Sequence, residues 1–173
     1  ISQFQTGGGT AEDEFIELHN TGSSPIDLNG YVLVYRSAAG STDVGPFASW
    51  TSSTIIQPGQ YYLIGATSYD GSAAADKIYN PATCSCSMGV NGGGLALRPS
   101  ANGTPVDMVG WGTATNAFIE GTVTAAAPVN DSRSRQNSGC QDTNNNANDF
   151  VATSPSTPRN SSSTPFQCSG NNG

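Results

Sequence analysis

The sequence predicts an all-β protein folded as a single β-sandwich, and three observations support this class. Short runs of β-branched and aromatic residues are separated by breaks rich in Gly and Pro. No window keeps apolar residues at helical spacing beyond about two turns, and residues 72–77 are the best candidate for one short helical turn. A chain of 173 residues fits one domain and can bury roughly 70% of its unfolded surface, so it forms a core without a partner.

Residues 13–35 are the segment around which the rest of the chain is organised, because apolar residues step by two on both sides of a polar break at 20–25. Ile16 and Leu18 precede the break. The apolar positions that follow it are Ile26, Leu28, Tyr31, Leu33 and Tyr35. This pattern predicts a strand, a loop and a second strand. Residues 1–5 also alternate and are expected to add a first strand at an edge of the sandwich.

Two long connections are predicted, at residues 36–54 and 68–94, and connections of this length are typical of functional or mobile loops. Residues 55–64 lie between them and predict a strand, a turn and another strand. The turn is expected to be of type II, because Pro58 is followed by Gly59.

Residues 95–97 and 106–111 are predicted to pair as a hairpin around Asn102 and Gly103. In the second of these strands the odd-numbered residues share one face and the even-numbered residues the other. We expect one of these sets to face the core and the other to be only partly covered.

The last strand is expected at residues 150–151, and a weaker strand is expected within residues 116–129. The chain ends in a segment of Ser, Thr, Asn and Gly with few apolar residues. The prediction is therefore a sandwich domain over residues 1–160 and a C-terminal tail over residues 161–173. We expect only a disulfide to hold this tail in place.

The charge balance argues against nucleic acid as a partner. The net charge is −7 and the isoelectric point is near 4.3, so the chain repels a phosphate backbone. Its six cations form no run longer than Arg133-Ser134-Arg135. No stretch approaches the ~20 consecutive apolar residues that a membrane-spanning helix needs.

Residues 14–33, EFIELHNTGSSPIDLNGYVL, resemble the opening of the lamin tail domain, an immunoglobulin-like β-sandwich. Segments that match the same family in the same order are residues 63–65, 94–97, 106–112 and 142–150. The resemblance implies an immunoglobulin-like sandwich with long irregular loops. It also implies an accessory role, since bacterial members occur in secreted proteins beside nuclease or other hydrolase domains. The nuclear role of lamins is not expected, because the acidic charge balance opposes contact with DNA.

Four cysteines in a Ser-, Thr- and Asn-rich chain indicate an oxidising compartment, and they allow three disulfide pairings. A zinc site is not expected, because Cys84 and Cys86 lack the spacing of a zinc half-site and His19 lies far away in the sequence. The resemblance implies that Cys140 pairs with Cys168, which leaves Cys84 to pair with Cys86. The first pair closes a loop of about 28 residues and is expected to add about 3 kcal/mol of stability.

The segment between the last cysteines contains hard oxygen donors at alternating positions of a loop. These four residues are Asp142, Asn144, Asn146 and Asp149. Calcium binds six to eight such oxygens and tolerates irregular geometry, so one interpretation is a calcium site. The other interpretation is that these side chains bond their own backbone through successive turns and that Asp149 pairs with Arg133 or Arg135.

Aromatic residues in the middle of the chain also allow two interpretations. Trp50, Tyr61 and Tyr62 are candidates for a flat platform on which sugars stack. Alternatively, they close the open ends of the sandwich core. If they form a platform, the chain is a carbohydrate-binding module that calcium assists.

Catalysis is not expected of this chain. His19 is its one histidine, and it alternates out of phase with Ile16 and Leu18, so it is expected to face solvent. No nucleophile elbow, zinc-protease helix or phosphate loop is present. Four carboxylates gather at Glu12, Asp13, Glu14 and Glu17. They are interpreted as a solvated strand entry, with a cation site as the alternative.

Together these observations predict a non-catalytic binding or tethering module that is secreted and lies outside the cell or at the cell envelope. Its expected partners are an envelope polymer, a glycan or a protein, with a hydrolase domain as a neighbour in the same protein. The alternative is a calcium-assisted carbohydrate-binding module. Calcium is the one cofactor that the sequence suggests.

Overall fold

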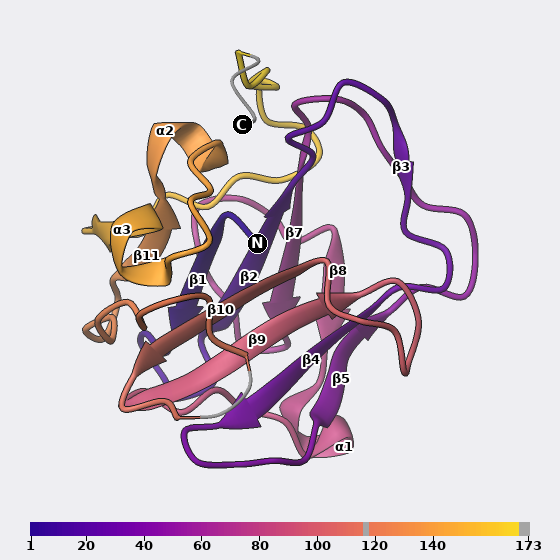
Figure 1. Ribbon diagram of the computed structural model, residues 1–173. Helices are drawn as coiled ribbons and strands as arrows, with labels where there is room; N and C mark the ends of the chain where they lie inside the picture. The colour runs from indigo at the N-terminus through magenta and orange to yellow at the C-terminus, as the bar shows by residue number, and fades with distance from the viewer. Residues whose placement is uncertain (116–117, 170–173) are drawn as a thin grey trace.

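Two β-sheets pack face to face in the computed structural model, which describes residues 1–115 and 118–169 (Figure 1). The strands of the six-stranded sheet, in spatial order, are β12 (Phe150–Thr153), β11 (Ser132–Arg135), β1 (Gln3–Thr6), β2 (Glu14–His19), β7 (Tyr61–Ala66) and β8 (Lys77–Tyr79). Neighbouring strands are antiparallel except β7 and β8, which are parallel. The chain is therefore mostly β and immunoglobulin-like in architecture, as predicted.

The second sheet has four strands. In spatial order they are β10 (Asp107–Gly112), β9 (Gly92–Arg98), β4 (Val32–Ser37) and β5 (Val44–Ser49). A separate two-stranded ladder joins β3 (Ile26–Asp27) to β6 (Ile55–Ile56) and forms an arm that projects beside the sandwich (Figure 1). The predicted hairpin is confirmed, because β9 and β10 pair directly.

Helical structure in the described residues is limited to three four-residue segments, α1 (Pro81–Cys84), α2 (Gln136–Gly139) and α3 (Asn146–Asp149). The helical turn expected at residues 72–77 is absent, so that prediction was wrong. The turn forms at α1 instead, where Asn80 caps the first turn and Pro81 has a fixed φ that suits the first helical position. No helix in the described part of the chain is long and apolar enough to cross a membrane.

The core lies between the two sheets and is built by the predicted alternation. Ile16 and Leu18 of β2 face Leu33 of β4, and all three are buried. Phe4 of β1 contacts Trp111 of β10 across the sandwich with ring centroids 4.8 Å apart. Such aromatic contacts contribute about 0.5–1.5 kcal/mol beyond the area they bury.

The alternation predicted for β10 is also confirmed. Val109 and Trp111 face the main core and are fully buried. Met108 lies on the opposite face and is only partly buried, in a small second cluster with Val34 and Ala96. One face of this strand is thus in the core and the other is partly covered.

The position of the first strand differs from the prediction. β1 lies in the interior of the six-stranded sheet, between β2 and β11, rather than at an edge. The reason is that β11, which was not predicted as a strand, returns from residue 132 and pairs with β1 on its outer side. Both faces of the neighbouring β2 are buried, because Phe15 and Glu17 are covered as completely as Ile16.

The predicted long connections contain regular structure. Residues 36–54 include β5, and residues 68–94 include β8 and α1. The strand expected after residue 25 is divided into β3 and β4 at Gly30, whose φ of 88° favours glycine. The predicted type II turn is confirmed at Gly59, which has a φ of 73°.

The strand expected within residues 116–129 is not confirmed. Asn116 and Ala117 lie outside the described residues. In the remainder, Thr124 makes one isolated bridge to Trp111 and no strand forms.

The C-terminal segment is held in place much more firmly than predicted. We call residues 154–169 the C-terminal strap. Arg159 donates three hydrogen bonds to the buried Glu17, one from its backbone N–H and two from its guanidinium. Phe166 donates its N–H to the Gly59 carbonyl. Its described part is therefore fixed by hydrogen bonds as well as by the disulfide at Cys168. Residues 170–173 of the predicted tail lie outside the described residues.

Candidate functional site

A cleft of about 950 Å³ opens at one end of the sandwich, between the β3 arm, residues 137–144 and the C-terminal strap. Its floor consists of buried apolar side chains: Ile1, Leu18, Leu28, Ile56 and Leu97. These side chains belong to the main core cluster, and polar side chains make up much of the remaining lining. An apolar hollow with a few polar groups is the usual form of a ligand site.

The rim of the cleft holds exposed apolar side chains. Val106 is 56% exposed, Phe166 46% and Ile26 38%, and all three border the cleft. Eight large apolar side chains are exposed in the described residues, so three of the eight gather at this one site. Grouped exposure of this kind marks interaction sites, whereas single exposed apolar residues are ordinary.

One wall of the cleft is charged and is centred on Arg135, whose side chain is 3% exposed. Its guanidinium lies 2.9 Å from Asp107, 3.1 Å from Asp142 and 3.4 Å from Asp149. Glu120 lies 3.9 Å away. Four carboxylates thus surround one guanidinium, and Asp107 is also paired with the N-terminal ammonium group of Ile1. Burial, followed by the charge of Asp107, raises the pKa of Glu120 to about 7.

His19 forms another part of the cleft wall and is only partly exposed, whereas the sequence pattern predicted that it faces solvent. Its ring stacks on Tyr61 with centroids 4.3 Å apart, and Nε2 lies 2.9 Å from the Phe166 carbonyl oxygen. Nδ1 is buried and has no hydrogen-bond partner. Burial lowers the pKa of His19, so the ring is neutral near pH 7. The C-terminal strap covers this side chain, which the sequence pattern did not indicate.

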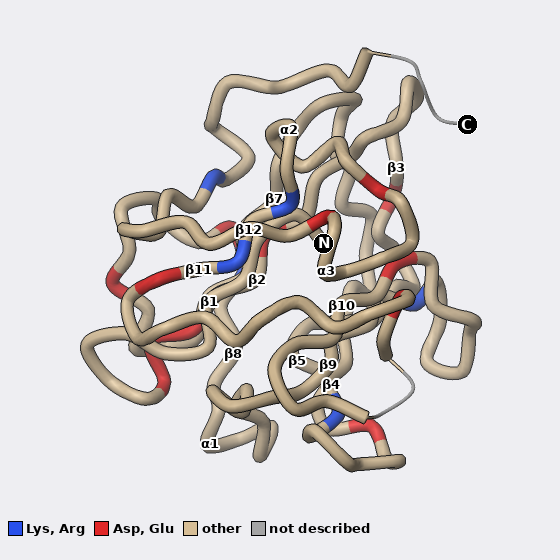
Figure 2. The backbone as a smooth tube through the Cα atoms, turned by 60° about the vertical axis from the view of Figure 1, so that its left-hand side comes forward, with Lys and Arg blue, Asp and Glu red and all other residues tan. Residues whose placement is uncertain are grey.

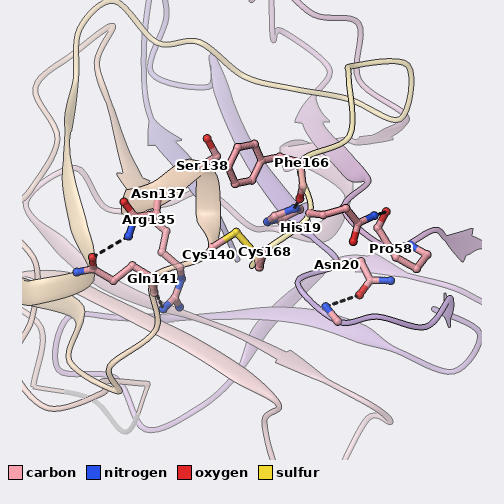
Figure 3. The surroundings of a disulfide bond; sticks show 12 residues. His19, Asn20, Pro58, Arg135, Asn137, Ser138, Cys140, Gln141, Phe166 and Cys168 are labelled. Atoms are coloured by element: carbon pink, nitrogen blue, oxygen red, sulfur yellow. Dashed lines mark hydrogen bonds between the residues drawn. A yellow bond between two sulfur atoms is a disulfide. The ribbon is translucent and has the colours of Figure 1, made fainter. Parts of the chain in front are cut away.

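Both disulfides form as the resemblance implied. Cys140 is bonded to Cys168 and Cys84 to Cys86. The Cys140–Cys168 bond lies beside the imidazole of His19, as Figure 3 shows. These three residues, which are far apart in the sequence, therefore meet at the cleft.

Three of the four predicted calcium ligands, Asp142, Asn146 and Asp149, are held by other contacts. The Asp149 carboxylate is buried and accepts hydrogen bonds from Thr143 and Asn145 in addition to its contact with Arg135. Asn146 is equally buried and bridges the backbone of β10 to that of Glu120.

Asp142 accepts from the Asn144 N–H and contacts Arg135, so the only oxygens of the set that reach solvent are those of Asp142 and Asn144. This arrangement favours the interpretation as turn structure. Calcium binding at these residues stays a prediction.

The predicted aromatic platform is largely inside the protein. Trp50 is 4% exposed and Tyr61 1%, and only Tyr62 is partly exposed. The Tyr61 ring is covered by His19 and by the Arg159 guanidinium, which lies 3.8 Å from its centroid. The aromatic side chains therefore close the core, as the second interpretation expected. Trp50 and Tyr61 offer no open face on which a sugar could stack.

The four acidic residues at 12–17 are not a solvated strand entry except at Glu12, because Asp13 is buried just before β2 and Glu14 and Glu17 are buried within it. Glu14 is fully buried and accepts hydrogen bonds from the Tyr79 hydroxyl and the Met88 N–H, each at 2.6 Å. Burial raises the pKa of Glu14 to about 7. Glu17, also fully buried, is paired with Arg159. These carboxylates anchor loops, and neither is placed to act on a bound molecule.

Positive charge is dispersed over the molecule. Figure 2 shows Lys and Arg as single positions at separate places along the chain. Arg36 and Arg98 share Asp43, while Arg135 and Arg159 are paired with buried acids. The described residues therefore present no continuous basic surface of the kind that binds a phosphate backbone.

The cleft and the central position of Arg135 were not predicted from the sequence. One usable signal was the pair Arg133 and Arg135, which alternate as strand residues do and precede the Asp- and Asn-rich loop. The predicted pairing with that loop is confirmed for Arg135. Arg133 instead donates to the Ala126 carbonyl.

Two comparisons with known proteins bear on this site. A family model described as Lamin Tail Domain matches residues 1–113. This range contains β1 to β10, including the β3 arm and all five residues of the cleft floor. No curated protein matches the chain.

Proposed function

Since the chain belongs to the lamin tail domain family, we propose that it is an extracellular tethering module. Membership of this family suggests an immunoglobulin-like binding module without enzymatic activity. In this proposal the module binds a protein partner through the cleft. The partner contributes a peptide segment with an apolar side chain next to a cationic one. The two disulfides support a location outside the cell, because such bonds persist in oxidising compartments.

The observation that carries the proposal is the apolar rim above an apolar floor. Val106, Phe166 and Ile26 are exposed around a hollow that reaches the core. Full burial of an exposed side chain of this kind contributes about 1.5–3 kcal/mol, and since each of the three is already about half buried, a partner that covers it gains about half of that value. Interfaces commonly derive most of their affinity from a few buried anchors of this kind.

The charges around the cleft favour a cationic segment. Asp107 and Asp142 line the cleft, and the one guanidinium among them, that of Arg135, is already surrounded by four carboxylates. The whole chain also carries a net charge of −7. A partner with Lys or Arg beside its apolar anchor is therefore attracted and correctly oriented.

A binding role also agrees with the hydrogen bonding of three ionisable side chains, which are occupied within the protein. His19 is covered by the strap, and Glu14 and Glu17 are saturated by hydrogen bonds inside the protein. General acid–base catalysis requires a group within hydrogen-bond reach of a substrate proton. The buried carboxylates serve instead to hold the walls of the sandwich.

The experiment selects peptides from a random displayed library on the immobilised protein and measures their affinity by calorimetry. The test variant is Val106→Asp, and the matched control is Val129→Asp. Val129 is also 56% exposed but does not border the cleft. We expect selected peptides to combine apolar and basic residues. Their affinity is expected to fall about tenfold or more with Val106→Asp and to stay unchanged with Val129→Asp.

Two outcomes contradict the proposal. Equal effects of the two variants would mean that the cleft is not the binding surface. Retention of the protein on an insoluble glycan without any peptide binding would instead favour the carbohydrate-binding alternative. The burial of Trp50 and Tyr61 argues against that alternative.

A further inference from the structure

Three potential metal ligands meet at the edge of the cleft. A ring nitrogen of His19 and the sulfur atoms of Cys140 and Cys168 all lie within 4.8 Å of one another. They come from the end of β2, from the residue after α2 and from the C-terminal strap. This is the one group of three or more His, Cys, Asp or Glu side chains with metal-binding spacing in the part of the chain that the structure describes.

The imidazole is oriented as in a metal site. Nε2 lies 2.9 Å from the Phe166 carbonyl oxygen, which can only accept, so Nε2 carries the proton and Nδ1 a lone pair. Metal-binding histidines commonly donate their second ring N–H to a backbone carbonyl in this way. Nδ1 is buried without a hydrogen-bond partner, although a buried polar atom usually has one.

The unpartnered nitrogen faces the cysteines. A Cβ placed on Gly139 would lie 2.9 Å from Nδ1, so this atom is next to the turn that carries Cys140. Figure 3 shows one ring nitrogen bonded toward Phe166 and the other on the side of the disulfide. Because Nε2 is bonded to the Phe166 carbonyl, Nδ1 is the ring nitrogen that is free to become a ligand beside the two sulfur atoms.

We propose that reduction of the Cys140–Cys168 disulfide creates a Zn²⁺ site made of the two thiolates and His19 Nδ1. A dithiol reductant supplies two electrons and two protons, becomes a disulfide itself and leaves two thiols on the protein. Zn²⁺ then binds the two sulfur atoms and displaces two protons to solvent. A water molecule from the cleft takes the fourth position, since all three ligands line it.

The geometry needs only local movement. Zinc binds sulfur at about 2.3 Å and nitrogen at about 2.0 Å, so tetrahedral ligand atoms lie about 3.5–3.8 Å apart. The present atoms already lie within 4.8 Å, and rotation of the cysteine side chains supplies the difference.

Contacts other than the disulfide keep the ligands in place when it opens. Two hydrogen bonds keep the strap attached. The Phe166 N–H donates to the Gly59 carbonyl, and the Gln167 side chain donates to the Pro58 carbonyl. The turn that bears Cys140 is held by a hydrogen bond from the Cys140 N–H to the Asn137 carbonyl. The reduced protein therefore presents a preformed site, which lowers the entropic cost of metal binding.

The test uses the full chain with Cys84→Ser and Cys86→Ser, so that no other thiol competes. The protein is reduced with a phosphine without oxygen and titrated with Co²⁺, and Zn²⁺ is then added to displace the cobalt. We expect one Co²⁺ per chain, with thiolate-to-cobalt charge-transfer absorption and a d–d spectrum of four-coordinate cobalt. The same protein in its oxidised form is expected to bind none.

Substitutions of His19 identify the third ligand. Loss of a group that only orients a ligand costs about 10–100-fold in metal affinity, so His19→Ala is expected to cost at least that much. His19→Cys restores a third ligand and is expected to recover tight binding with a spectrum of three thiolates. Thermal melts of the oxidised variants check that each one folds.

Either of two results overturns the proposal. If the reduced protein takes up no Co²⁺, the three groups do not form a site. If His19→Ala binds as tightly as the parent, the two cysteines chelate metal without the histidine.

Discussion

The Arg135 guanidinium donates to the Asp107 carboxylate at 2.9 Å and so joins the two sheets of the sandwich, because Arg135 ends β11 and Asp107 begins β10. The contact lies in the wall of the cleft. The same guanidinium also reaches Asp149, and its plane lies 4.8 Å from the ring of Phe150. Arg135 thus connects the proposed binding site to the packing of the core.

Replacing Arg135 by Leu is expected to lower the free energy of unfolding by about 3–5 kcal/mol. The reason is that Asp149, which is fully buried, keeps its charge but loses its partner cation. Urea unfolding measures this loss. The matched control is Asp43→Ala, which breaks two more exposed pairs with Arg36 and Arg98 and is expected to cost less than about 1 kcal/mol. Equal losses in the two variants would contradict the central role of Arg135.

Stability is expected to fall as the pH rises through the range in which Glu120 ionises. Burial raises the pKa of this carboxyl to about 7, whereas an unfolded Glu has a pKa of about 4.3. Between these values the folded state binds more protons than the unfolded state, so the free energy of unfolding decreases with pH. The loss begins above about pH 4 and is complete above about pH 7.

The variant Glu120→Gln tests this expectation, because an amide keeps an oxygen for Asn146 but does not ionise. We expect it to raise the thermal midpoint by several degrees at pH 8 and to leave it unchanged at pH 4. The difference between the midpoint-versus-pH curves of the variant and the wild type contains only the effect of Glu120. It removes the effect of His19, whose lowered pKa makes stability rise with pH. Asp70→Asn, at an exposed acid, is the control. A midpoint that is lower than that of the wild type at pH 8 would refute the assignment.

Replacing Cys140 and Cys168 together by Ser is expected to cost about 3–4 kcal/mol, because the disulfide closes a loop with a sequence separation of 28 residues. The same change at Cys84 and Cys86 is expected to cost only about 1 kcal/mol, since that loop is very short. Thermal unfolding measures both losses.

The C-terminal strap is expected to stay docked in the first variant, because Arg159 remains bonded to Glu17. Hydrogen exchange at the Phe166 amide checks this, as that N–H is bonded to the Gly59 carbonyl. Full loss of protection would show that the disulfide alone holds the strap.

The Asn-rich loop is expected to keep its structure without calcium. Its buried members, Asn146 and Asp149, already bond to backbone groups, Thr143 and Arg135. A thermal melt in chelator should therefore match one with about 1 mM calcium, whereas a site with a dissociation constant near 0.1 mM would raise the midpoint by roughly 3–6 °C. A rise of that size that disappears in Asp142→Ala would restore the interpretation as a metal site.

The parts of the fold that the sequence predicted are those governed by local periodicity. The alternation of Ile16 with Leu18 and of Val109 with Trp111 identifies strands and their buried faces, because side chains on a strand point to opposite sides with a period of two. The turn at Gly59 follows in the same way from the chemistry of two adjacent residues. These features need no knowledge of what packs against them.

Fewer features of the candidate site could be predicted from local sequence patterns. The disulfide between Cys140 and Cys168 and the pairing of Arg135 with the Asn-rich loop were anticipated. The burial of Trp50 was one of two interpretations that the sequence left open. The covered position of His19 was not anticipated, because it depends on a segment that is distant in the sequence. Amphipathic side chains such as Trp and His occur both in cores and on surfaces, so their type does not decide their exposure.

The sequence by itself therefore determined that this protein is an all-β sandwich of the lamin tail type, with strands whose apolar faces are set by local alternation. Only the tertiary structure decided that β1 lies inside its sheet and that the C-terminal strap covers β2. It also decided that His19 meets Cys140 and Cys168. The physical reason is that these contacts join residues up to about 150 positions apart, and their energies depend on burial in the complete fold rather than on neighbours along the chain.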